Sequence, residues 1–131
     1  MLRIRVEIIS NTTVIHCAGR IVLGEETATL HDAIARHSAN RIIFLDLAEV
    51  QRIDAAGLGT LVGVREWARA GGRSLKLMNV TEHVERLLTL TNLSSLFEIC
   101  SVAEMLWLCF MKTESSLVAA AKSLGRDLQY N

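Results

Sequence analysis

The sequence predicts an α/β fold, a mixed and mainly parallel sheet of about four or five strands with helices packed on it. Segments with the apolar patterns of strands alternate along the chain with segments of helical spacing, which is typical of βαβ units. Half of the 131 residues are apolar and 21% are charged, the balance of a globular domain. A chain of this length needs neither a metal nor disulfides to fold.

The first elements form a predicted β-hairpin. Residues 3–8 alternate polar and apolar side chains, so we expect a strand with one buried face. Residues 10–12 have the chemistry of a turn, and residues 14–18 are a second strand.

The middle of the chain contains the central elements. Apolar spacing predicts a helix over residues 25–37, and the nearly continuous apolar run at 41–47 predicts a central strand buried on both faces. We expect a short loop over residues 48–53. A second helix follows Asp54 and stops at the pair of glycines that begins with Gly71.

The later elements continue the alternation. We expect a strand over residues 74–78, a helix capped by Thr81, and a short edge strand over residues 96–99. Ser101 and Glu104 have the spacing of a capping box, which predicts a further helix after Ser101.

The C-terminal region differs in composition from the rest, and we divide the chain into a domain over residues 1–111 and a helical extension over residues 112–131. Residues 102–111 are apolar on every side of a helix, so another element must cover them. Residues 115–128 also have helical spacing and could supply that cover, either from the same chain or from a second subunit. We favour the second subunit and expect a homodimer through the C-terminal helices.

A glycine pattern over residues 57–63 offers one alternative function. It matches a loose G-x-G-x-x-x-G that follows a strand and begins a helix, as in a pyrophosphate-binding loop. The expected loop at 48–53 is too long for a dinucleotide fold, and Asn79 stands where a ribose-binding carboxylate is needed. We therefore rank a small nucleotide-binding enzyme last, and expect Gly59 and Gly63 to allow close helix packing instead.

The sequence predicts no catalytic site, no cofactor and no metal. The four histidines have no metal-binding spacing, and no serine or cysteine lies in a nucleophile motif. The three cysteines include no C-x-x-C pair, which suits the reduced thiols of a cytoplasmic protein.

Charge and hydropathy argue against two classes of partner. The fourteen basic and fourteen acidic residues cancel, so neither nucleic acid nor an anionic membrane surface is an expected partner. The apolar run over residues 105–111 is far shorter than a membrane span, and the N-terminus lacks the apolar stretch of a signal peptide. We expect a cytoplasmic protein with no membrane insertion.

The region around Asp54 resembles the signature of STAS domains, the anti-sigma factor antagonists. In that family an apolar strand ending in Asp precedes the pattern V-x-x-[IMF]-D-[ST]-[ST]-G-L. The resemblance covers residues 1 to about 106. The matching segments are Leu45-Asp46-Leu47-Ala48, Val50, Ile53-Asp54-Ala55-Ala56-Gly57-Leu58-Gly59, Gly19-Arg20-Ile21, Ala70-Gly71-Gly72-Arg73, and the Leu-rich stretch from Val84 to Phe97.

The resemblance implies a mainly parallel sheet and a protein-binding switch without an active site. A typical antagonist binds an anti-sigma factor, a kinase of the histidine-kinase-like ATPase fold, and so frees a sigma factor. The kinase ends the interaction by phosphorylating the second hydroxyl residue of the signature. Here Ala56 stands at that position and Ala55 at the preceding one, so neither can carry phosphate.

The leading hypothesis is a non-catalytic STAS regulator that binds an anti-sigma factor or a related protein and is not switched at this loop. Asp54 caps the helix or accepts a hydrogen bond from the partner. The alternative is a STAS accessory subunit that regulates a transport ATPase. The expected partner-binding residues are Asp54, Ala55, Ala56, Gly57, Leu58, Gly59, Thr60, Gly63 and Trp67.

Overall fold

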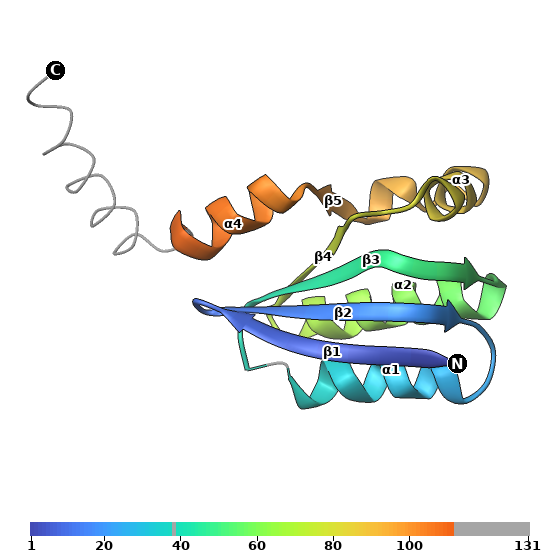
Figure 1. Ribbon diagram of the computed structural model, residues 1–131, viewed down its shortest axis with the longest axis horizontal. Helices are drawn as coiled ribbons and strands as arrows, with labels where there is room; N and C mark the ends of the chain where they lie inside the picture. Colours follow the sequence, from blue (N-terminus) through green and yellow to red (C-terminus); the bar gives the residue numbers. More distant parts are fainter. Residues whose placement is uncertain (38, 112–131) are drawn as a thin grey trace, which may run out of the picture.

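The computed structural model describes residues 1–37 and 39–111, and its five strands form one sheet in the order β1-β2-β3-β4-β5 (Figure 1). β1 pairs antiparallel with β2, and every other neighbouring pair is parallel. The predicted hairpin and mainly parallel sheet are therefore confirmed. The strands are β1 (Leu2–Ile9), β2 (Thr12–Ile21), β3 (Ile42–Ile53), β4 (Ser74–Met78) and β5 (Glu98–Cys100).

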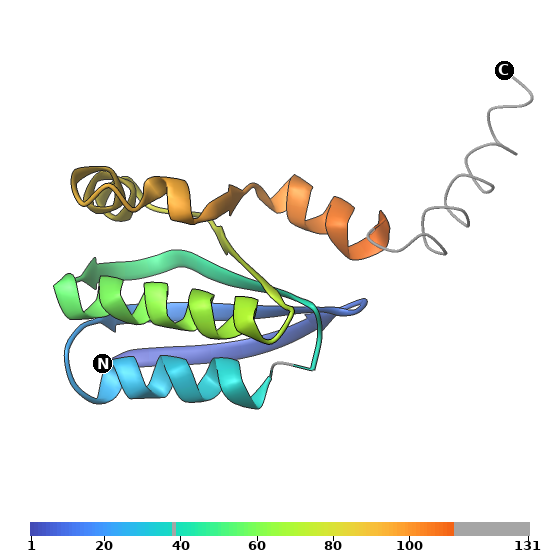
Figure 2. The ribbon, with the colours of Figure 1, turned by 180° about the vertical axis from the view of Figure 1, so that it is seen from behind.

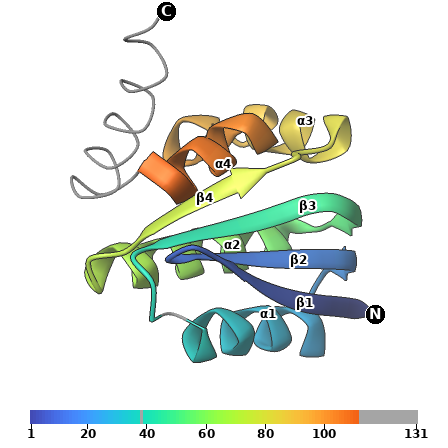
Figure 3. The same cartoon turned by 60° about the vertical axis from the view of Figure 1, so that its left-hand side comes forward.

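The helices lie on both faces of this sheet. α1 and α2 lie side by side on one face, as the view from behind shows (Figure 2). α4 packs through Met105 and Cys109 against the opposite face; Figure 3 shows it beside β4. The helices are α1 (Glu25–Arg36), α2 (Ala55–Ala70), α3 (Glu82–Leu90) and α4 (Val102–Met111), with a 3₁₀ turn at Ser94–Leu96.

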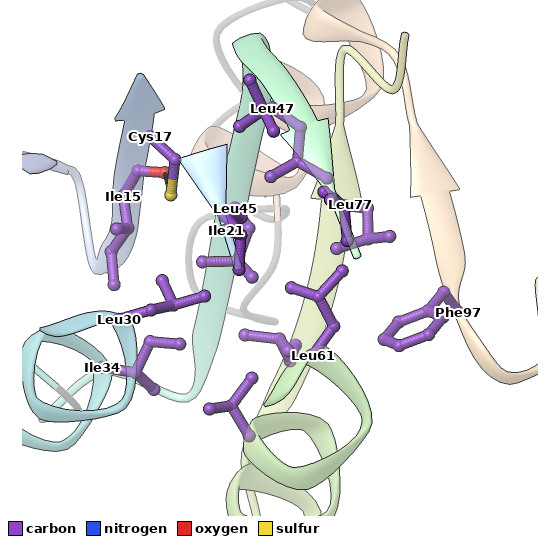
Figure 4. Close-up of a cluster of buried hydrophobic side chains, with 14 of the residues drawn as sticks. Ile15, Cys17, Ile21, Leu30, Ile34, Leu45, Leu47, Leu61, Leu77 and Phe97 are labelled. Atoms are coloured by element: carbon purple, nitrogen blue, oxygen red, sulfur yellow. Dashed lines mark hydrogen bonds between the residues drawn. The ribbon is translucent and has the colours of Figure 1, made fainter. Parts of the chain in front are cut away.

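The larger core lies between the sheet and helices α1, α2 and α3. Alternate side chains of the central strands, among them Ile15, Leu45 and Leu77, meet Leu30 of α1 and Leu61 of α2 (Figure 4). All five are fully buried. Burying each contributes roughly 1.5–3 kcal/mol, so this face fixes the position of α2.

The smaller core lies on the opposite face, where Val14, Phe44 and Met78 meet Met105 and Cys109 of α4. The predicted capping box begins that helix: Ser101 Oγ accepts a hydrogen bond from the Glu104 backbone N–H, and Glu104 Oε1 accepts one from the Ser101 N–H. The predicted helical extension over residues 112–131 lies outside the described residues.

One prediction is wrong: residues 48–53 continue strand β3 instead of forming a loop. They pair with the end of β2, where Gly19 faces Val50 and Ile21 faces Ile53. The pairing register shifts twice along this stretch, which breaks the two-residue alternation by which a strand is recognised. Asp54 alone then joins β3 to α2, so the loop-length argument against a dinucleotide fold fails.

The expectation for Gly59 and Gly63 is also wrong. A Cβ atom on either glycine would meet no described atom within 4 Å, so neither permits close packing within the described fold. The close approach occurs at Gly57, where an added Cβ would lie 1.9 Å from the carbonyl oxygen of Ile21. Only glycine fits at that contact.

Candidate functional site

The Asp54 carboxylate organises the start of α2. Its Oδ1 accepts a 2.8 Å hydrogen bond from the Gly57 backbone N–H, and its Oδ2 accepts a 3.2 Å bond from the Leu23 N–H. These two N–H groups lower the pKa of Asp54 below its ordinary value of 3.8. Asp54 is thus a helix cap, as predicted, and also anchors the loop between β2 and α1.

The exposed residues in the first half of α2 are small. Ala55, Gly59 and Gly63 are exposed and Ala56 is half-buried. A helical turn of 3.6 residues brings these four onto one side of α2. The result is a surface of small residues that begins at Ala55 and Ala56.

Three other residues expected at the site face the protein itself. Gly57 and Leu58 are buried and hold the start of α2 against the sheet. Thr60 is half-buried, and its Oγ1 donates a 3.0 Å hydrogen bond to the carbonyl oxygen of Ala56. The Thr60 hydroxyl therefore already donates a hydrogen bond within the helix.

Trp67 lies at the margin of this surface and is 36% exposed. Its ring centroid is 6.2 Å from that of His31 in α1, in an edge-on arrangement. The guanidinium carbon of Arg73 lies 5.5 Å from the Trp67 ring centroid. Trp67 thus joins α1 to the end of α2 while part of its ring faces solvent.

Leu23 is a candidate contact residue that the sequence did not indicate. Its side chain is 76% exposed, and its backbone N–H is held by Asp54. The loop that carries it ends at Gly24, whose φ of 115° suits glycine. In the sequence, Leu23 is marked only as an apolar residue beside a glycine. That pattern is common in loops and does not indicate a contact residue.

A second polar cluster lies on the open part of the sheet face that α4 leaves uncovered. His16 Nδ1 is 2.6 Å from Oδ2 of Asp46, and His16 Nε2 is 2.8 Å from Oε1 of Glu7. Burial raises the pKa of Asp46, but hydrogen bonds from Asn79, Ala48 and His16 outweigh it and hold that pKa below 3.8. The cluster links β1, β2 and β3.

The described residues hold no group of three His, Cys, Asp or Glu side chains placed to bind a metal ion. All three cysteines are buried. No described helix has the length and apolar character needed to cross a membrane.

Comparison with known proteins agrees with this geometry. The family model of the STAS domain matches residues 3–105. A Thermotoga maritima protein assigned as an anti-sigma factor antagonist is 39% identical over 57 residues, which are 44% of this chain and 50% of the relative. The Bacillus subtilis anti-sigma-B factor antagonist is 36% identical over 58 residues, 44% of this chain and 53% of the relative. The chain therefore spans about half the length of these curated relatives.

Solved structures share the fold. A Thermotoga maritima protein assigned as an anti-sigma factor antagonist superposes with a TM-score of 0.70 at 23% identity, over 79% of this chain and 91% of that one. The anti-sigma factor antagonist SpoIIAA in its unphosphorylated form gives a TM-score of 0.66 at 16% identity, over 80% and 94% of the two chains. Because the family model matches well over half of the 131 residues, the chain belongs to the STAS domain family.

Proposed function

We propose that this chain is a non-catalytic cytoplasmic regulator that binds an anti-sigma factor of the histidine-kinase-like ATPase fold. The observation that carries the proposal is the exposed row of small residues in the first half of α2, which follows the Asp54 cap and begins at the signature loop. The similarity to anti-sigma factor antagonists supplies the class of partner.

The proposed contact surface consists of Ala55, Ala56, Gly59 and Gly63, with Leu23 on one side and Trp67 on another. Glycine inside a helix costs about 1 kcal/mol relative to alanine. No described atom uses the space at Gly59 or Gly63. Close approach of a partner would use that space and would explain two glycines on an exposed helix face.

We further propose that phosphorylation at the signature loop does not control the interaction. A phosphate at a helix N-terminus adds about two negative charges beside the backbone N–H groups and any partner seated there. Ala55 and Ala56 have no hydroxyl to accept it. Binding would therefore be constitutive or be regulated elsewhere in the partner complex.

Titration calorimetry of the full chain with the anti-sigma factor from the same genome tests the proposal. Gly63→Trp places a large side chain on the exposed face of α2, where no described atom blocks it. We expect this variant to keep its melting temperature and to bind about tenfold more weakly or worse. His83→Trp, on an exposed position of α3, is the matched control and should bind normally. Equal affinity of both variants for the anti-sigma factor would show that this face of α2 is not the contact surface.

We also propose that the chain forms a homodimer through its C-terminal region. α4 carries four large apolar side chains that are 41–57% exposed within the described fold: Val102, Leu106, Trp107 and Phe110. The chain continues for 20 residues beyond α4, with Leu117, Leu124 and Leu128 at helical spacing. Sedimentation of the full chain should give a dimer, and a chain ending at Thr113 should aggregate. A soluble monomeric truncation with an unchanged melting temperature would disprove this assembly.

A further inference from the structure

An open cavity lies on the face of the sheet opposite to α1 and α2, over strands β1, β2 and β3. Figure 1 shows these strands from that side, in front of α2. The cavity has a volume of about 240 Å³, which is below the roughly 300–1,000 Å³ of pockets that hold drug-sized ligands. Its size therefore suits a small metabolite. Its lining includes Arg3, Arg5, His16, Ala18, Asp46 and Glu49.

The strand register explains why the sheet is hollow here. Arg3 of β1 is paired with Ala18 of β2, and Ala18 is paired with Glu49 of β3. Neighbouring strands lie about 4.8 Å apart, so the backbones at Arg3 and Glu49 are roughly 10 Å apart. Only the methyl group of Ala18 stands between them. The small side chain leaves space between a basic and an acidic residue.

A β-bulge in β3 brings Glu49 to this face. Between Asp46 and Glu49 the chain of β3 advances three residues, while its partner β2 advances two, from 16 to 18. Leu47 and Val50 both belong to the core on the other face, so the bulge leaves Glu49 on the exposed side. Bulges often lie beside functional sites, where they redirect a side chain.

Hydrogen bonds to Asp46 hold this bulge in place. Asp46 Oδ1 accepts bonds from the Ala48 backbone N–H and from Asn79 Nδ2, each at 3.0 Å. Asp46 Oδ2 lies 2.6 Å from His16 Nδ1. The strand segment that presents Glu49 is thus attached to its neighbours on both sides.

The two sides of the cavity carry opposite charges. Its basic residues, Arg3 and Arg5, come from β1, and its acidic residues come from β3. Glu7, the acidic residue of β1, lies outside the lining and is bonded to His16. Within residues 1–37 and 39–111, neither Arg3 nor Glu49 has an ion-pair partner. A ligand of one sign would be attracted by one strand and repelled by the other, whereas a zwitterion matches both.

We propose that this cavity binds a small zwitterion whose carboxylate and ammonium groups are joined by a short aliphatic chain. The carboxylate would lie toward Arg3 and Arg5, because a guanidinium pairs with a carboxylate through two parallel hydrogen bonds. The ammonium would lie toward Glu49 and Asp46, and the aliphatic chain would cross Ala18. Because α2 packs on the other face of the sheet, this site does not depend on the proposed anti-sigma factor surface.

Titration of the ¹⁵N-labelled full chain with 5-aminopentanoate, followed by backbone amide chemical shifts, tests the proposal. We expect saturable shifts at Ala18 and at its neighbours in β1 and β3. Pentanoate and pentylamine each carry one of the two charges. Loss of a hydrogen bond between charged groups costs about 1.5–3 kcal/mol, so each should bind about tenfold more weakly or worse at equal ionic strength.

Two matched variants separate the site from general charge effects. Glu49→Gln removes the acidic charge without breaking an ion pair among the described residues. It should keep its melting temperature and bind 5-aminopentanoate about tenfold more weakly or worse. Glu85→Gln makes the same change at an exposed position of α3 and should bind normally. Absence of saturable shifts, equal binding of pentanoate or pentylamine, full binding by Glu49→Gln, or equal loss in both variants would overturn the proposal.

Discussion

The Asp54 carboxylate binds the backbone N–H of Leu23, which lies 31 residues earlier in the chain, at 3.2 Å. The same carboxylate caps α2 through Gly57. One side chain thus fixes both the helix that begins the signature and the loop that presents Leu23. The proposed partner surface depends on this double attachment.

Removing that attachment should destabilise the fold and loosen the loop. We expect Asp54→Ala to lower the urea midpoint, and Asp54→Asn to lower it less because an amide oxygen can still cap the helix. The folded-state pKa of Asp54 lies below its ordinary value of 3.8. Its contribution is therefore present above about that pH and is lost as the pH falls through the folded pKa. Urea unfolding curves measured from neutral to acidic pH should show the midpoint of the wild type approaching that of Asp54→Asn.

The two glycines nearest the signature should respond in opposite ways to alanine. Gly57→Ala would force a Cβ into the carbonyl oxygen of Ile21, so we expect a loss of about 1–3 kcal/mol or more in the free energy of unfolding. Gly59→Ala meets open space and should stabilise the protein by about 0.5–1 kcal/mol. Chemical denaturation measures both. A stable Gly57→Ala variant would contradict the packing described between α2 and β2.

The cluster of His16, Asp46 and Glu7 should make stability depend on pH. Asp46 accepts hydrogen bonds from Asn79 Nδ2 and the Ala48 backbone N–H, and its Oδ2 lies 2.6 Å from His16 Nδ1. We expect Asp46→Asn to lose about 1 kcal/mol near neutral pH. The pKa of Asp46 is lowered in the fold, so this difference should persist above about pH 3.8 and shrink as the pH falls through the folded pKa. Glu49→Gln, on the same strand, is the control and should change stability little.

Cys17 should be inert in the folded protein. Burial, together with the nearby charge of Asp46, raises its pKa to about 12, so almost no thiolate is present near neutral pH. Mass spectrometry after brief iodoacetamide treatment should find Cys17 unmodified in the native chain and alkylated in urea. Rapid native alkylation at Cys17 would show that β2 opens far more readily than its buried position implies.

Local sequence signals predicted most of the fold. β4 matches the predicted range of residues 74–78. The caps at Thr81 and Ser101 form as expected, because in each the hydroxyl accepts a hydrogen bond from the backbone N–H three residues later. The strand over residues 48–53 was missed because the shift in pairing register hides its alternation. A bulge depends on the partner strand, which a single segment does not reveal.

The site was predictable only in part, for a similar reason. The exposure of Ala55, Gly59 and Gly63 follows from the helical period once α2 is placed. The hydrogen bond from the Leu23 N–H to the Asp54 carboxylate joins segments 31 residues apart in the sequence. Such contacts leave no periodic pattern, so only the assembled fold reveals them.

The proposal that phosphorylation at the signature loop does not control binding is tested most directly with the anti-sigma factor kinase and ATP. The full chain is incubated with both, and its phosphate content and its binding are then measured. We expect mass spectrometry to find no phosphate between Asp54 and Thr60, and binding to be the same with and without ATP. The Ala56→Ser variant should gain one phosphate, and its affinity for the anti-sigma factor should fall only when ATP is present. Phosphate on Thr60, or loss of wild-type binding after ATP, would contradict the proposed constitutive interaction.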